Sequence, residues 1–102
     1  MTRQDHLLTI AAEECMETAQ RITKALRFGM DEVQPGQEMN NAERIMQEYA
    51  DLLCILGRIA KEDKTFHAAF NDVEQVGKWM SEKWKKVEHF LEYSAQQGRL
   101  EK

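Results

Sequence analysis

Two pairs of acidic residues stand at positions where helices should carry apolar side chains. Glu14 and Glu17 are three residues apart, and so are Glu48 and Asp51. Residues with this spacing are neighbours on one helical face. At 100° per residue, Glu14 and Glu48 fall inside the apolar arcs of their segments, and Glu17 and Asp51 lie at the edges. Each segment therefore presents two carboxylates on the face that should pack.

Such carboxylates are costly in a core unless a cation lies between them. Four of them facing one another would repel strongly. Mg²⁺ and Mn²⁺ are hard cations that take oxygen ligands. Zinc is disfavoured, because no histidine or cysteine lies nearby on the same face. The pattern predicts a Mg²⁺ site, with Mn²⁺ able to substitute. The competing interpretation is that the acids are solvated or form ion pairs with Arg21, Lys24 and Arg44.

Basic residues follow the acids along the first of these faces. Arg21 also falls inside the apolar arc, and Lys24 lies at its edge. Acids followed by bases along one helical face would suit a metal ion next to a phosphate chain. Alternatively, Arg21 pairs with Glu17 within the helix or with a carboxylate of the second segment.

Three helical segments must position these residues. Gly29 offers a C-terminal cap to the first segment, and a loop with a Pro-Gly turn follows it. Asn40 or Asn41 can cap the second segment. A short polar connection, 62–65, leads to the third segment, where Asn71 resembles a cap and would divide it into a short and a long helix. The predicted segments are 4–28, 41–61 and 66–97.

The third segment carries a continuous apolar stripe from Phe66 to Leu91, which we interpret as core. No segment alternates like a strand. The sequence therefore predicts an all-α fold, an antiparallel bundle of three to four helices in a single domain over residues 1–102. A chain of 102 residues has a small core, so we expect oligomerisation to complete the bundle.

The composition excludes several classes of protein. The chain is 42% hydrophobic and 31% charged, with a net charge of −4, which suits a soluble protein and argues against binding to nucleic-acid polymers. It has no apolar run long enough to span a membrane and no apolar signal core near its first residue. Cys15 and Cys54 are too few for a disulfide framework, so we expect buried, reduced thiols and a cytoplasmic location.

Two short motifs resemble those of a known family. The run Glu13-Glu14-Cys15-Met16-Glu17 resembles the EExxE element of the MazG-like all-α nucleoside triphosphate pyrophosphohydrolases. The run Glu48-Tyr49-Ala50-Asp51 resembles their ExxD element, which lies on the following helix. Residues 24–29 and 83–87 also resemble small, phage-type members. The Pro-Gly loop makes the separation of the two motifs slightly longer than usual.

The resemblance implies an enzyme that hydrolyses NTPs or dNTPs to the nucleoside monophosphate and pyrophosphate, as in house-cleaning of the nucleotide pool. It implies Mg²⁺ held by the motif carboxylates, and homodimers or homotetramers with sites near subunit interfaces. Glu13 matches the first motif position but turns outward on the wheel, so we expect a supporting role for it. The implied metal ligands are Glu14, Glu17, Glu48 and Asp51.

The residue types are consistent with that chemistry, because phosphoryl transfer needs neutralised phosphate charge and a positioned water. One carboxylate could act as the catalytic base, and we favour Glu17 or Glu48. The candidates for phosphate contacts are Arg21, Lys24, Arg27 and Lys83, although a solvated helix face is the competing interpretation for Lys83. The alternative function is a non-catalytic dimeric helical module, whose acidic and basic stripes pair across subunits.

Overall fold

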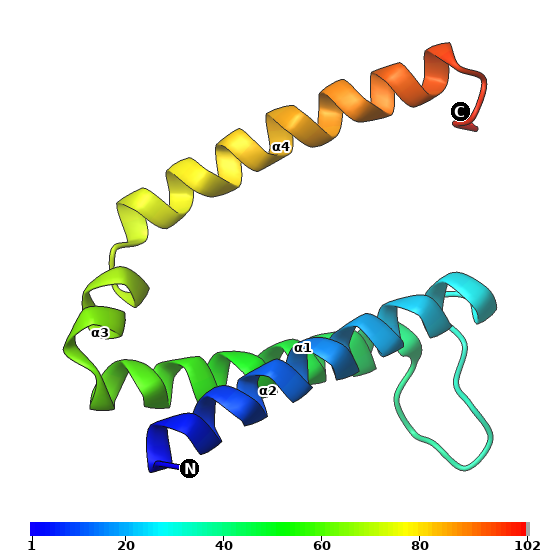
Figure 1. Ribbon diagram of the computed structural model, residues 1–102. Coiled ribbons are helices and arrows are strands. Elements are labelled where there is room, and N and C mark those ends of the chain that lie inside the picture. Colours follow the sequence, from blue (N-terminus) through cyan, green and yellow to red (C-terminus); the bar gives the residue numbers. More distant parts are fainter. Residues whose placement is uncertain (102) are drawn as a thin grey trace. The chain divides into compact units, whose positions relative to one another are not determined.

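The computed structural model describes residues 1–101, and all of its regular structure there is helical. The predicted all-α class is confirmed, and none of the described helices is long and apolar enough to cross a membrane. The chain divides into two compact units, Met1–Phe70 and Asn71–Lys102, which we describe separately. The single domain over 1–102 therefore stays a prediction. The helices are α1 (Arg3–Phe28), α2 (Asn41–Glu62), α3 (Lys64–Phe70) and α4 (Val73–Gln96) (Figure 1).

Local hydrogen bonds determine both ends of α1. At the N-terminus, the Asp5 backbone N–H donates to the Thr2 hydroxyl (3.0 Å), and the Thr2 N–H donates to the Asp5 carboxylate (2.9 Å). This capping box starts the helix one residue before the predicted position. At the other end, Gly29 adopts a φ of 101°, which favours glycine, and its N–H donates to the Ala25 carbonyl (2.8 Å). The predicted cap at Gly29 is confirmed.

The loop between α1 and α2 is held at both of its ends. Asn40 caps α2 as predicted, in a second capping box with Glu43. The side chain of Asn41 is buried and donates to the Gly29 carbonyl (2.8 Å) and to the Glu32 carboxylate (3.1 Å). These bonds join the end of α1 to the start of α2, so they hold the two ends of the loop together.

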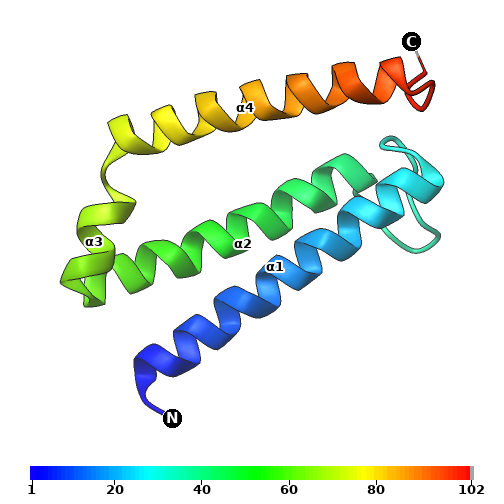
Figure 2. The same cartoon turned by 45° about the horizontal axis from the view of Figure 1, so that its top comes forward.

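Helices α1 and α2 lie side by side as an antiparallel hairpin (Figures 1 and 2). Ile59 is the largest buried apolar residue of this hairpin and is 2% exposed. The others are the small residues Ala11, Ala25 and Ala60. At the open end of the hairpin, the Arg3 guanidinium pairs with Glu62 (2.6 Å) and the Gln4 amide donates to Asp63 (2.9 Å). The first unit therefore has a small core between its two long helices.

The connections around α3 differ in detail from the prediction. The polar connection predicted at 62–65 is reduced to Asp63, whose carboxylate accepts a hydrogen bond from the Phe66 N–H (2.8 Å). The third segment is divided where predicted, since α3 ends at Phe70. The cap of α4 is Asp72, which accepts from the Gln75 N–H (3.0 Å), so the assignment of this cap to Asn71 is wrong by one residue.

Two expectations about burial are wrong. None of the residues of α3 and α4 is buried, although their apolar stripe was expected to form core, and Trp84 is 58% exposed. The second unit contains one long helix, so within that unit the α4 part of the stripe has no second helix to pack against. Phe66 and Phe70, in the α3 part, are half-buried. Cys15 and Cys54 are exposed thiols rather than buried ones. The periodicity identifies an apolar stripe, but it does not determine whether another surface covers that stripe.

Candidate functional site

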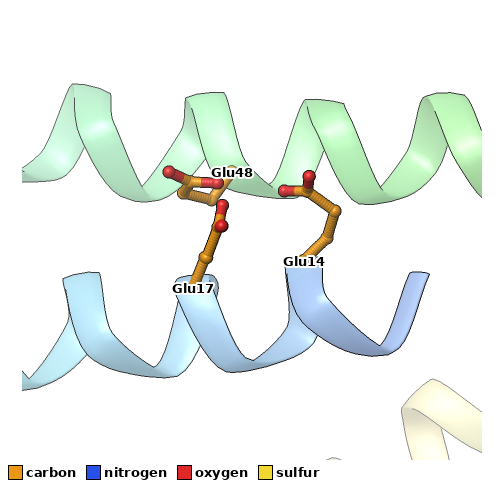
Figure 3. Close-up of side chains that lie close together, drawn as sticks. All are labelled: Glu14, Glu17 and Glu48. Atoms are coloured by element: carbon orange, nitrogen blue, oxygen red, sulfur yellow. The ribbon is translucent and has the colours of Figure 1, made fainter. Parts of the chain in front are cut away.

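Three of the four predicted acids converge between α1 and α2. Glu14 and Glu17 extend from α1, and Glu48 extends from α2 toward them (Figure 3). Each contributes one carboxylate oxygen to a group in which all oxygens lie within 4.8 Å of one another. We call these residues the acid trio. The two motifs therefore face each other across the hairpin.

Two oxygens of the acid trio are buried without a hydrogen-bond donor. Glu48 is 9% exposed and Glu14 is half-buried, while Glu17 is exposed. Among the described residues, nothing donates a hydrogen bond to Oε2 of Glu14 or to Oε2 of Glu48. Buried polar atoms in native proteins are nearly always paired, because an unpaired one costs free energy. These two oxygens therefore point to a group that satisfies them, and a hard cation fits an all-oxygen set.

The surroundings of Glu14 and Glu17 raise the pKa of both carboxyl groups. Burial raises the pKa of Glu14, and the neighbouring charge of Glu17 raises it further. A side-chain hydrogen bond with Glu48 raises the pKa of Glu17, and the charge of Glu48 acts in the same direction. Without a cation, Glu14 and Glu17 are therefore easier to protonate than isolated glutamates would be. A bound cation would reverse this preference by favouring the ionised carboxylates.

The fourth predicted ligand lies outside the acid trio. Asp51 is exposed and contributes no atom to the group of three oxygens. Its charge nevertheless contributes to the raised pKa of Glu14, so it lies near enough to influence the site. Its role as a ligand stays a prediction. Glu13 is exposed, which confirms the expectation that it turns outward.

The predicted phosphate-contacting residues fall into different environments. Arg21 is half-buried, and its Nε lies 3.8 Å from Oε1 of Glu48, as in the interpretation that pairs it with a carboxylate of the second segment. Lys24 is also half-buried. Arg27 is exposed, and its guanidinium lies 5.1 Å from the centre of the Phe28 ring. Lys83 is exposed on α4 in the second unit, and its contribution to the site stays a prediction.

Sequence reasoning gave too little weight to Arg44. This residue is 9% exposed and donates from Nη1 to the Oε1 atom of Gln34 (2.9 Å). The sequence interpretation considered it only as an ion-pair partner for the acids. Its position four residues before Glu48 places both on one face of α2, and this spacing was the available signal.

Comparison with known proteins identifies no relative: no protein-family model matches the chain, and neither does a curated protein or a solved structure. The resemblance to the MazG-like family therefore rests on the two acidic motifs and stays a prediction.

Proposed function

We propose that the acid trio binds a divalent cation, Mg²⁺ or Mn²⁺, and that the protein is a nucleoside triphosphate pyrophosphohydrolase. The observation that carries this proposal is the pair of buried oxygens without donors, Oε2 of Glu14 and Oε2 of Glu48, on opposite helices. Glu17 adds a third oxygen within 4.8 Å. Carboxylates from two facing helices supply the charge and the ligand type that these cations need.

In this proposal Glu14, Glu17 and Glu48 hold the cation, with Asp51 as a further ligand. When bound, the cation neutralises phosphate charge and lowers the pKa of a coordinated water. Hydrolysis breaks the bond between the α-phosphorus and the oxygen that bridges to the β-phosphorus. Water adds to the α-phosphorus, and the products are the nucleoside monophosphate and pyrophosphate.

Of the two candidates for the base, the structure favours Glu17. Its side chain is exposed, whereas Glu48 is buried and lies beside the Arg21 guanidinium. A base must reach the water whose proton it accepts, and an exposed carboxylate does so more readily. Arg21 and Lys24, on the next turns of α1, would contribute positive charge toward the phosphates.

A biochemical assay tests the proposal directly. Purified protein is incubated with each canonical NTP and dNTP and with modified dNTPs, in Mg²⁺, Mn²⁺ or EDTA, and pyrophosphate release is measured. We expect release from at least one nucleotide only when a divalent cation is present. Glu48→Ala should lower the rate roughly a hundredfold or more, because charge stabilisation by a metal ion contributes several kcal/mol. Glu38→Ala is the matched control, since Glu38 is exposed in the loop.

A thermal melt tests cation binding without turnover. A ligand that binds only the folded state raises the melting temperature, so Mg²⁺ should raise it for the wild type but not for Glu48→Ala. The proposal is wrong if no nucleotide is hydrolysed with either ion and Mg²⁺ shifts the melting temperatures of both proteins equally or not at all.

The exposed face of α4 favours a second proposal, that the protein assembles with copies of itself as a homodimer or homotetramer. This face carries Trp79, Met80 and Trp84, which are all more than half exposed. Patches of exposed aromatic residues and methionine are typical of protein interfaces. Assembly through α4 would also serve the alternative function, a non-catalytic helical module, which the nucleotide assay distinguishes. We also propose a cytoplasmic location, because both cysteines are free thiols and reduced thiols are typical of that compartment.

A further inference from the structure

Arg44 is a buried cation that forms no ion pair with a carboxylate among the described residues. It is 9% exposed, and within residues 1–101 the only acceptor for its side chain is the neutral amide oxygen of Gln34. A guanidinium carries five N–H donors and stays charged in proteins. Charged groups are rarely buried unless an opposite charge accompanies them. Within the described residues, Arg44 therefore lacks the ion pair that such a group normally has.

The nearest acid on the same helical face does not supply this anion. Glu48 lies one turn further along α2 and pairs through Oε1 with Arg21 at 3.8 Å. Its Oε2 has no hydrogen-bond partner among the described residues, so Arg44 does not bond to it either. No ion pair joins Arg44 to any carboxylate of the described residues. Gln34 binds Nη1 alone. Nε and Nη2 have no acceptor in that part of the chain, and neither atom is fully buried, so both can reach a ligand from solvent.

We propose that Arg44 binds a phosphate group and that Gln34 holds its guanidinium in position to do so. The planar guanidinium matches phosphate with two parallel hydrogen bonds, which is why arginine is frequent at phosphate sites. Arg44 lies one helical turn from Glu48, so a polyphosphate that reaches the acid trio would also come within reach of Arg44. The identity of the ligand as a nucleoside triphosphate rests on the proposed function, whereas the binding of a phosphate depends on Arg44 itself.

The probe for this inference is inorganic pyrophosphate, which needs no turnover. Its affinity is measured by calorimetry in EDTA and in Mg²⁺. We expect Arg44→Gln to weaken binding about tenfold or more, because a charged donor to the phosphate is lost. Arg44→Lys should weaken it less, since it keeps the charge but loses the planar fork. Arg58→Gln is the control, because Arg58 is an exposed arginine on the same helix and should leave binding unchanged.

A second measurement covers the case in which Arg44→Gln does not fold. In ¹⁵N-labelled wild-type protein, pyrophosphate should shift the Arg44 Nε–H resonance and leave that of Arg58 in place. The inference is overturned if Arg44→Gln binds pyrophosphate as tightly as the wild type, or if the Arg44 resonance does not move in either buffer.

These outcomes separate the inference from the proposed function. If pyrophosphate shifts the Arg44 resonance while no nucleotide is hydrolysed, the phosphate site stands and the enzymatic proposal falls. If nucleotides are hydrolysed and Arg44→Gln leaves KM and pyrophosphate affinity unchanged, the enzymatic proposal stands and the role of Arg44 falls.

Discussion

The α1–α2 hairpin and helix α4 are both amphipathic, but they depart from ordinary packing in opposite ways. In the hairpin, the charged residues Arg44 and Glu48 are buried on the packing face. In α4, the apolar residues Met80 and Trp84 are largely exposed. A buried charged group with unpaired polar atoms points to a ligand of opposite charge, whereas an exposed apolar surface points to a partner protein surface. The hairpin is therefore the candidate for chemistry, and α4 is the candidate for assembly.

The largest expected effect is a difference in stability between a substitution in the hairpin and one on α4. Ile59 is 2% exposed in the hairpin, so Ile59→Ala should destabilise the protein by about 2–5 kcal/mol. Met80 is 68% exposed on α4, so Met80→Ala should change the unfolding free energy of a monomer by less than about 0.5 kcal/mol. Urea titrations of both variants at low protein concentration measure these values. Equal losses would mean that α4 is packed as firmly as the hairpin core.

The next effect concerns assembly. Trp84→Ala should raise the dissociation constant of the oligomer roughly tenfold or more, because buried tryptophans contribute strongly to protein interfaces. Analytical ultracentrifugation over a range of concentrations measures the change. Lys85→Ala, at an exposed neighbouring position outside the apolar stripe, is the control. A wild-type protein that sediments as an 11.9 kDa monomer at every concentration would contradict assembly through α4.

A smaller effect is expected from neutralising one member of the acid trio. Glu14→Gln removes a partly buried carboxylate whose pKa is raised by burial and by the charge of Glu17. In EDTA the variant should melt at a higher temperature than the wild type, because repulsion within the trio is reduced. In Mg²⁺ it should lose the rise that the wild type gains. If Glu14→Gln melts lower in EDTA and keeps the rise in Mg²⁺, the trio is a structural cluster and not a cation site.

The smallest effect is a dependence of stability on pH. The pKa values of Glu14 and Glu17 are raised in the folded state above their ordinary 4.5, so above this pH the folded state binds more protons than the unfolded state. The metal-free protein should therefore lose stability as the pH rises from 4.5 through the raised values. The lowered pKa values of Glu62 and Asp63 act in the opposite direction, with their stabilisation lost as the pH falls below their ordinary values of 4.5 and 3.8.

Melting temperatures at about pH 5 and about pH 7.5, in EDTA and in Mg²⁺, check this dependence. The loss between the two pH values should be smaller in Mg²⁺, because the cation favours the ionised carboxylates. A protein whose metal-free stability rises over this interval would show that other groups dominate the titration.

The helix ends and the outward position of Glu13 could be predicted from the sequence because they depend on local interactions. Gly29 and Asn40 terminate and cap helices through bonds to residues within four positions. The break near Phe70 was predicted for the same reason, although the capping bond forms at Asp72 and not at Asn71. The burial of the third segment could not be predicted, because a stripe of apolar residues looks the same whether or not a second surface covers it.

The sequence by itself determined the all-α class and the two acidic motifs on the packing faces, since helical periodicity is a property of neighbouring residues. Only the tertiary structure decided which of these acids meet. Glu14, Glu17 and Glu48 form the acid trio, and Asp51 lies outside it. The sequence alone could not decide this, because the register of α1 against α2 depends on contacts between residues distant in the sequence. The same register brings Arg21 beside Glu48, while Arg44 donates to the amide of Gln34 and forms no ion pair with a carboxylate of residues 1–101.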